Sequence, residues 1–527
     1  MLTGKIKNLF CANIIFVLIS FLSFADGYKI NSVNYNVTGC GWKIFGRTNP
    51  YAISLNVPVD TNQIFTNEDD LNKYLDDYKV RLANLRAFET IEVNETRTEE
   101  ENLTLIDLEV FVKDSFHLLA VPYPKYDSNN GLNLKFKIKD TNFLGTLNTL
   151  STDIFILFAS QESDNKTNQI GFNFDFDFPF DLGIFDVTWV NEDSFSYTFG
   201  EVMPEWNAKT GFKFELPVKN LTFTLEAYQY VINDFDYKDY GDNFYFKEDF
   251  KFSVPITLTK ILNKYELKYS PYVEAVLNWD KDGINEENTD LLSPLITAGH
   301  SIYSNRVNWS ENMRNGYDVT LFNSFNYNVP RNIFYTEVGI DALFFHKFEF
   351  NDWNIKDWHF LNRLGINTNI YFYANYILND RNFEKNDGRK IGERLRGIRD
   401  DQLYSDETLG KSCLTTSAIV LNLDFPLQIL KTNLPWDIIN FDFQISPFID
   451  AALIKNKMTG KYFDPKDGFY CAGFEALVFP KKWSSMTVRA SVGVDIGRLL
   501  FSDYLNMDWR NTDTSKVEIS FGVGLFY

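Results

Sequence analysis

The stretch IGFNFDFDFPF, from Ile170 to Phe180, places an apolar residue at every second position. Five phenylalanines occupy the even positions from 172 to 180, and the residues between them include Gly171, Asn173, Asp175 and Asp177. Successive side chains of a β-strand point to opposite faces of the sheet, so one face of this strand is aromatic and the other acidic. Such a strand needs apolar surroundings on one side and water on the other.

The same alternation recurs through most of the chain after Ser115. It is clearest in IVLNLDF (419–425), in MTVRASVGVDI (486–496) and in the last residues, VEISFGVGLFY (517–527). In the last of these, Val517, Ile519, Phe521, Val523, Leu525 and Tyr527 alternate with small or polar residues. A period of two over 9–11 residues is typical of a tilted strand that crosses a bilayer.

A sheet in lipid must close on itself, because no water is present to pair with the backbone groups of an open edge. The outer face then meets hydrocarbon and the inner face meets water, which explains the alternation. The sequence therefore predicts an all-β transmembrane barrel over 116–527, with 16 antiparallel strands or possibly 18. The alternative is a soluble all-β sandwich or solenoid, in which one alternating face packs inward.

The first part of the chain differs from this pattern. Lys5 and Lys7 precede an apolar run and then Ser23-Phe24-Ala25, so residues 1–25 read as a secretory signal peptide. Residues 26–115 mix one helix with strands and predict a small α+β domain. Thr66 and Asp69 have the spacing of a capping box, and the apolar residues of the following helix recur at three and four: Leu71, Leu75, Tyr78, Leu82 and Leu85. Two strands follow, near FETIEV and LTLIDLEVFV.

Composition excludes several classes of function. The formal net charge of -20 over 527 residues argues against nucleic acid as a partner. The four histidines are dispersed, and neither a GxSxG motif nor a phosphate-binding glycine loop is present. We therefore expect no enzyme, cofactor or metal; the alternative is a catalytic dyad inside the barrel, as in outer-membrane lipases or proteases. Beyond Cys11, the cysteines are Cys40, Cys413 and Cys471. The sequence does not decide whether Cys413 and Cys471 form a disulfide.

One connection is long and strongly charged. It spans residues 377–412 and contains Arg394, Arg396 and Arg399. A connection of this length without secondary structure of its own is usually functional. Two predicted strands later, the polar residues of QISPFIDAALI face the lumen, and Asp450 is one of them. An arginine from an inward-folding loop could form a bidentate pair with Asp450 there.

Here the sequence resembles a known family. A module of strand, helices and two strands followed by a barrel is similar to a POTRA domain and the barrel of the BamA/TamA outer-membrane insertase superfamily. The family carries an apolar-Arg-Gly-aromatic motif in its sixth extracellular loop, and the arginine contacts the aspartate of a Phe-x-Asp-x-Gly motif on a nearby strand. LRGI at 395–398 and FIDAA at 448–452 match these motifs, DTNFLGT at 140–146 matches an early barrel turn, and Tyr527 matches the terminal aromatic residue.

The resemblance implies a lock made by Leu395, Arg396, Gly397 and Ile398 with Phe448 and Asp450. Ile398 and Ala452 depart from the family motifs, which have an aromatic residue and a glycine at these positions. The resemblance also implies a seam between the first and last strands. In this seam the last strand contributes Phe521, Gly522, Gly524, Leu525 and Tyr527, and its glycines weaken pairing.

The implied function is assembly, insertion or translocation of proteins at the outer membrane, with the N-terminal domain in the periplasm. Unfolded outer-membrane or secreted proteins, periplasmic accessory proteins and outer-membrane lipid are the expected partners. Capture would occur by addition of a substrate strand to an exposed sheet edge. Residues 26–115 have space for only one POTRA-like module, so the sequence does not decide between a barrel-assembly and a translocation subfamily. The alternative function is a passive porin or uptake channel with a periplasmic appendage.

Overall fold

The computed structural model describes residues 27–39, 47–100, 103–127, 131–158, 168–233, 244–261, 265–281, 283–284, 291–350, 353–355, 358–360, 363–379, 389–398, 414–434, 440–481, 487–510 and 515–523. The expected signal peptide lies outside these residues. The chain divides into two compact units at Ser115, Met1–Ser115 and Phe116–Tyr527. Within the described ranges, no helix has the length and apolar character needed to span a membrane.

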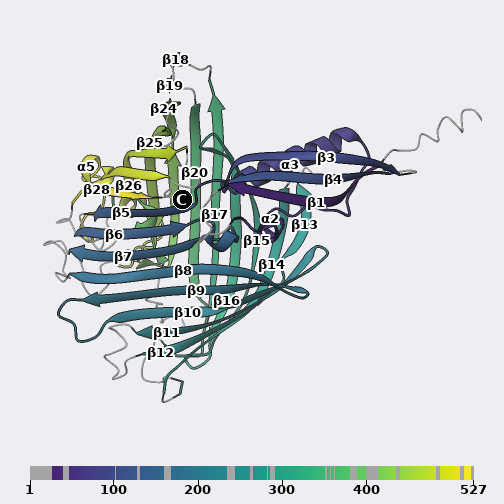
Figure 1. Ribbon diagram of the computed structural model, residues 1–527. Helices are drawn as coiled ribbons and strands as arrows, with labels where there is room; N and C mark the ends of the chain where they lie inside the picture. The colour runs from purple at the N-terminus through teal and green to yellow at the C-terminus, as the bar shows by residue number, and fades with distance from the viewer. Residues whose placement is uncertain are drawn as a thin grey trace, which may run out of the picture. The chain divides into compact units, whose positions relative to one another are not determined.

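The first unit is a four-stranded sheet with two helices (Figure 1). Its sheet order is β2-β1-β4-β3, in which β1 runs parallel to β4 and β3 runs antiparallel to β4. The elements are β1 (Gly27–Gly39), α2 (Pro50–Asn56), β2 (Ile64–Phe65), α3 (Glu68–Asn84), β3 (Phe88–Glu100) and β4 (Leu103–Asp114).

The apolar stripe of α3 faces the sheet as its spacing predicts. Four residues of the helix are buried: Leu71, Leu75, Tyr78 and Leu82. Leu71 and Leu75 share a core with side chains of β1 and β4: Ile30, Ile106 and Leu108. The expected capping residue was wrong by one position. Asn67, not Thr66, caps the helix, because its side chain accepts a hydrogen bond from Asp70 N at 2.8 Å.

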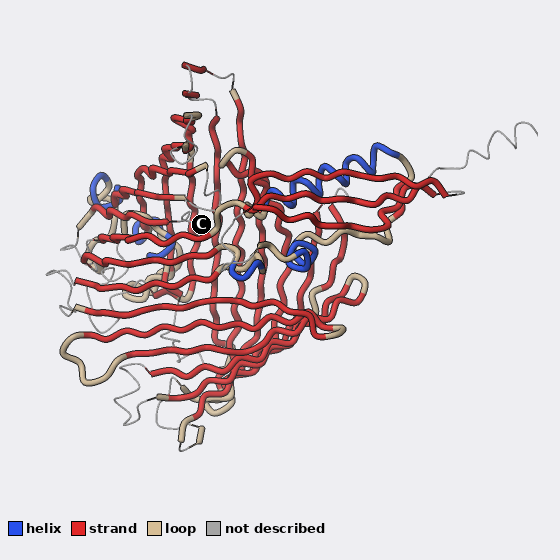
Figure 2. The backbone as a smooth tube through the Cα atoms, viewed as in Figure 1, coloured by secondary structure: helices blue, strands red, loops and turns tan. Residues whose placement is uncertain are grey.

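The second unit is a closed barrel, which Figures 1 and 2 show as an almost uninterrupted set of strands. Each strand pairs antiparallel with the next along the chain, and the last strand, β28, adjoins the first, β5. The segments are β5 (Leu118–Asp127), β6 (Gly131–Asp140), β7 (Leu150–Phe158), β8 (Gln169–Leu182), β9 (Phe185–Thr198), β10 (Glu205–Val218), β11 (Leu221–Asn233), β12 (Tyr245–Ser253), β13 (Ile256–Ile261), β14 (Tyr265–Trp279), β15 (Leu295–Ser310), β16 (Met313–Asn328), β17 (Ile333–Glu349), β18 (Trp353–Ile355), β19 (Trp358–Phe360), β20 (Arg363–Ile377), β23 (Ser417–Asp424), β24 (Leu427–Thr432), β25 (Phe441–Ile454), β26 (Phe469–Pro480), β27 (Val488–Asp495) and β28 (Val517–Val523).

The wall has eighteen strands in the part of the chain that the structure describes, the larger of the two expected numbers. The barrel contains 22 segments, but four of them continue a neighbouring segment across a short break. Two breaks coincide with proline: β12 continues as β13 past Pro255, and β23 continues as β24 past Pro426. Proline lacks a backbone donor, so it interrupts the ladder without ending the strand. The other two continuations are β17 into β18 and β19 into β20.

The wall is one layer thick, and both of its faces are accessible over much of the barrel. On β8, Phe172 is 44% exposed on one face, while Asp175 and Asp177 are exposed on the other. A sandwich would bury one of these faces, so the structure has the barrel and not the sandwich. The exposed apolar residues recur on the outward phase of neighbouring strands, as in Leu134, Phe136, Ile154, Ile156, Ile170 and Phe172.

The two ends of the barrel differ. The end at which β5 begins has tight turns, such as Glu311-Asn312 between β15 and β16, where both residues have positive φ as a two-residue hairpin turn requires. We call this the turn end. The opposite end, here the loop end, carries the longer connections 378–416, 455–468 and 496–516.

We predict that Phe172→Arg destabilises the folded barrel in lipid vesicles by as much as ~2–4 kcal/mol, the cost that an arginine on the lipid face has at the bilayer midplane. The neighbouring lumen-facing substitution, Asn173→Arg, should change the unfolding free energy by less than about 1 kcal/mol. Urea titration of both variants in vesicles measures the difference. Equal effects at the two positions would contradict the assignment of the faces.

Candidate functional site

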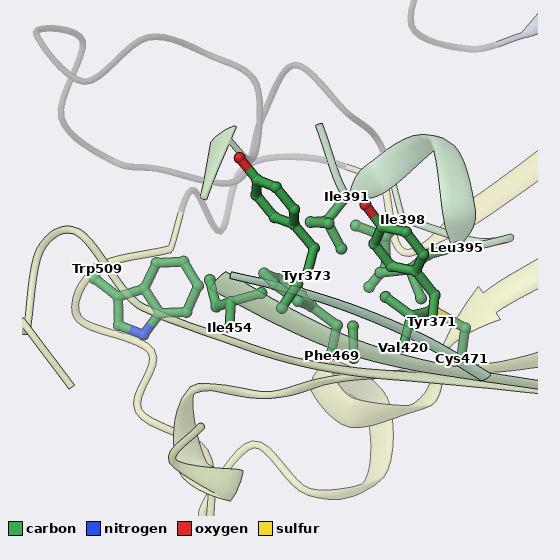
Figure 3. Close-up of a cluster of buried hydrophobic side chains, with 12 residues drawn as sticks. Tyr371, Tyr373, Ile391, Leu395, Ile398, Val420, Ile454, Phe469, Cys471 and Trp509 are labelled. Atoms are coloured by element: carbon green, nitrogen blue, oxygen red, sulfur yellow. The ribbon is translucent and has the colours of Figure 1, made fainter. Parts of the chain in front are cut away.

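The described part of the long connection, residues 389–398, packs against side chains on the inner face of the wall. It contains β21 (Arg389–Lys390), which pairs with β22 (Leu414–Thr415), and a 3-10 turn, η2 (Gly392–Arg394). Three apolar residues of this segment are buried, and Figure 3 shows them in one cluster with residues of the wall. The cluster comprises Ile391, Leu395 and Ile398 from the loop, Tyr371, Tyr373, Ala418, Val420, Ala452, Ile454, Phe469 and Cys471 from the strands, and Trp509.

Arg396 forms three hydrogen bonds with Asp450, which lies on β25. Arg396 Nε donates to Asp450 Oδ2 at 3.0 Å, Nη2 donates to Oδ1 at 2.7 Å, and the backbone N of Arg396 donates to Oδ2 at 2.9 Å. The side chains are 4% and 0% exposed. A bidentate guanidinium–carboxylate pair fixes orientation as well as distance, so it holds the loop in one register against β25.

Two further carboxylates surround the same guanidinium. Asp424 Oδ1 on β23 lies 2.7 Å from Arg396 Nη2, and Glu475 Oε1 on β26 lies 3.6 Å from Nη1. Burial alone would lower the pKa of Arg396, but the hydrogen bonds to Asp450 and the charges of the three carboxylates raise it above its ordinary value. Arg396 Cζ also lies 3.8 Å from the centre of the Phe448 ring, a cation–π contact.

Several residues beneath the loop form one row of cross-strand partners. The register pairs Asp424 with Phe448, Phe448 with Gly473, Gly473 with Gly493, and Gly493 with Glu518, across β23, β25, β26, β27 and β28. A side chain at Gly473 would meet the Phe448 ring at 2.6 Å. Small residues in this row therefore make space for the ring and for the loop above it.

Gly397 brings the loop backbone onto the last two strands. Its φ of 102° lies in the left-handed region, and a Cβ at this position would lie 2.7 Å from the backbone carbon of Gly493. Gly397 N donates a hydrogen bond of 2.7 Å to Glu518 Oε2 on β28. The lock thus spans from β23 to the strand that borders the seam.

Two more arginines of the loop bind the opposite flank of the wall. Arg394 Nη2 donates to Asp341 Oδ2 on β17 at 3.1 Å, and its Cζ lies 3.6 Å from the centre of the Tyr371 ring. Arg389 Nη1 donates to Tyr371 OH at 3.0 Å. The loop consequently contacts strands on both sides of β23.

The structure brings together the six residues that the resemblance singled out for the lock: Leu395, Arg396, Gly397, Ile398, Phe448 and Asp450. Ile398 and Ala452, the two departures from the family motifs, lie in the same buried cluster. Sequence reasoning missed Asp424, Glu475 and Glu518 as partners of the loop. Asp424 and Glu518 could have been found, since both lie on the polar phase of alternating strands, whereas Glu475 shares its face of β26 with Phe469, Cys471, Leu477 and Phe479.

The structure describes only some of the residues expected at the seam and only one of the two cysteines. Phe521 lies on β28 and faces outward, and Gly522 belongs to the same strand, whereas Gly524, Leu525 and Tyr527 lie outside the described residues. Cys471 is a buried free thiol and Cys413 lies outside the described residues. The DTNFLGT turn follows β6 at the turn end, where Asp140 Oδ1 accepts a hydrogen bond from Asn142 N at 2.9 Å.

No protein-family model matches the chain, and no curated protein matches it. Among solved structures, the chain is similar to CdiB from Acinetobacter baumannii, with 10% identity, a TM-score of 0.45 and coverage of 94% of this chain and 73% of that one. It is similar to CdiB from Escherichia coli, with 12% identity, a TM-score of 0.45 and coverage of 94% and 76%. It is also similar to BamA from Haemophilus ducreyi lacking POTRA domains 1–3, with 11% identity, a TM-score of 0.38 and coverage of 94% and 84%.

We predict that Arg396→Ala leaves the barrel folded but lowers its heat resistance in detergent. The substitution leaves Asp424, Asp450 and Glu475 buried without this cation, a change that costs about 3–5 kcal/mol for buried ion pairs. The temperature at which the folded band disappears on a semi-native gel reports the loss. Arg394→Ala, which removes a partly exposed pair worth about 1 kcal/mol or less, is the matched control. An unchanged unfolding temperature in Arg396→Ala would show that the Arg396–Asp450 pair does not stabilise the barrel.

A second prediction separates backbone strain from steric contact. Gly397 and Gly460 both have positive φ, but a Cβ at Gly397 meets the backbone of β27 and a Cβ at Gly460 meets nothing within 4 Å. Gly460→Ala should therefore cost about 1 kcal/mol, whereas Gly397→Ala should cost more and release the loop. Limited proteolysis of the 377–412 loop, with both variants compared, measures the release. Equal protection in the two variants would count against the close backbone contact.

Proposed function

We propose that this protein is an outer-membrane insertase or translocator of the BamA/TamA kind, with residues 26–115 on the periplasmic side. It would capture unfolded strands of a substrate and guide them at the seam between β5 and β28. The lock described above supports the proposal, because the family motif implied the Arg396–Asp450 contact and the two side chains do meet. The observation that carries the proposal is the construction of the seam itself.

The seam-facing edge of β5 lacks two backbone donors. Thr141 N donates to His117 O, and the register from Leu118↔Asp140 to Asp127↔Gly131 has no shift. In an antiparallel pair the hydrogen-bonded partners alternate, so the odd-numbered residues of β5 bond with β6 and the even-numbered residues face β28. Pro122 and Pro124 are even-numbered and carry no N–H. The pairing that closes the barrel is therefore weaker at this point, which favours opening of the seam to a substrate strand.

The inward loop is connected to this seam. Gly397 N binds Glu518 on β28, and Gly397 packs against Gly493 on β27. Movement of β28 away from β5 would disturb the contact with Glu518. We expect the lock to hold the last strand in the closed barrel and to loosen when the seam opens.

The first unit offers an edge for strand capture. Among the described elements β3 pairs only with β4, so its outer edge is available to a further strand. Most of its residues beyond Val93 are exposed, and many are charged, which discourages pairing with a second copy of the chain. A substrate strand could add to this edge by β-augmentation before it reaches the barrel.

The porin alternative predicts different behaviour. The lumen-facing carboxylates of β8 are exposed, so part of the lumen is accessible to water. A passive channel would give a large, steady conductance that does not depend on the seam. An insertase or translocator needs no nucleotide; burial of lipid-facing side chains and pairing of backbone amides supply the free energy.

The proposal is tested by locking the seam. A disulfide between β5 and β28, found by a cysteine scan around Ala120 and Ile519, should abolish assembly of a denatured barrel protein by this protein in vesicles, and reduction should restore it. A disulfide between Tyr303 and Thr320, which are partners on β15 and β16, is the control and should leave assembly intact. Full activity with the seam locked, together with a permanently open single-channel conductance, would favour the porin.

A further inference from the structure

The connection between β27 and β28 exposes four large side chains within six residues. It begins with the short helix α5 (Ile496–Leu500) and continues to Lys516. Leu499 is 54% exposed, Leu500 66%, Phe501 50% and Tyr504 54%. We call these four residues the rim patch. Figure 1 shows α5 at the end of the barrel next to β26 and β28.

The exposure does not come from a loosely attached segment. Leu505 and Trp509, which follow the patch, are buried. Trp509 Nε1 donates to Asp467 Oδ1 at 3.1 Å, its ring centroid lies 5.8 Å from that of Phe469, and Arg510 Nη2 donates to Gly468 O at 2.5 Å. One side of the connection is thus fixed to the barrel rim, and this attachment holds the rim patch in the open.

The rim patch continues the apolar outer surface of the wall. Val492, on β27, and Val517, Ile519 and Phe521, on β28, are exposed on the outward phase of their strands. Asp495 ends β27, and its side chain accepts a hydrogen bond from Arg498 N at 2.9 Å, so α5 starts directly where the outward-facing residues of β27 end. The patch therefore adjoins a surface that already contacts hydrocarbon.

We propose that the rim patch inserts into the acyl chains of the adjacent leaflet and anchors the loop end of β27 and β28 in the bilayer. Its composition fits this ligand: leucine and phenylalanine suit the acyl chains, and tyrosine suits the level of the headgroups. Lys466 is exposed beside the patch, with Nζ 5.7 Å from the centre of the Tyr504 ring, and would meet lipid phosphates. The anchor lies in the connection that leads into β28, the strand that borders the seam.

The test uses the full chain in lipid nanodiscs, with Cys11, Cys40 and Cys413 replaced by alanine and the buried Cys471 retained. A nitroxide is attached to Leu500→Cys, to Phe501→Cys as a second site in the patch, to Ile519→Cys as a lipid-facing reference, and to Asp503→Cys as an exposed polar site in the same connection. Power-saturation EPR then compares the access of oxygen, which concentrates in lipid, with that of a water-soluble nickel complex. Heat-shift gels confirm that each variant is folded.

The labels at Leu500 and Phe501 should resemble the label at Ile519, with high access to oxygen and low access to nickel, while the label at Asp503 should show the reverse. Nickel access at Leu500 and Phe501 equal to that at Asp503 would overturn the proposal and leave the patch as a surface for a protein partner. The readout does not depend on activity, so it stands or fails separately from the function at the seam.

Discussion

The requirement that every backbone amide be paired in hydrocarbon governs this structure. A sheet that must close has no edge and no second layer, so each strand presents one face to lipid and the other to the lumen. On β8, Phe172 lies on the lipid face and Asp175 lies on the lumen face. The same closure creates an interior in which a loop can be enclosed by the wall, and the lock depends on that enclosure.

Inside the barrel, the lock exchanges solvation of Arg396 for a set of buried carboxylates. A buried cation is unfavourable unless nearby charges and hydrogen bonds compensate for the lost water. Asp450 supplies the geometry, while Asp424 and Glu475 supply additional charge. Desolvation of the charges offsets much of the stability that a buried ion pair would add. The arrangement is therefore better suited to fixing one position of the loop than to stabilising the barrel.

The lock also reaches β28, the strand that lies beside β5 where the barrel closes. Pro122 and Pro124 remove donors from the edge of β5, whereas Glu518 on β28 binds the backbone of Gly397. The strand on one side of the seam thus lacks two backbone donors at its facing edge, and the strand on the other side is bound by the inward loop. Under the proposed function, this combination would let the seam open while the rest of the wall stays paired.

The sequence alone determined the fold class. Side chains alternate with period two over most of the chain, and one face of many strands is aromatic, as lipid contact in a membrane barrel requires. It also placed Asp450 on the lumen side, since the side-chain phase of a strand follows from counting residues. The apolar stripe of α3 was equally readable, although the cap was not, because Thr66 and Asn67 can both accept the same kind of hydrogen bond.

Only the tertiary structure decided which residues the loop meets. The strand number was ambiguous because chain length allows sixteen strands whereas the alternating stretches number nearer eighteen, and only the pairing of the strands decides between them. Val420 and Ile454 face the lumen, where alternation leads one to expect polar residues, because the loop covers them with apolar side chains of its own. Glu518 is more than 100 residues from Gly397 in the chain. Their contact follows from the pairing of consecutive strands from β23 to β28, which brings Glu518 beside a loop that local sequence patterns cannot position.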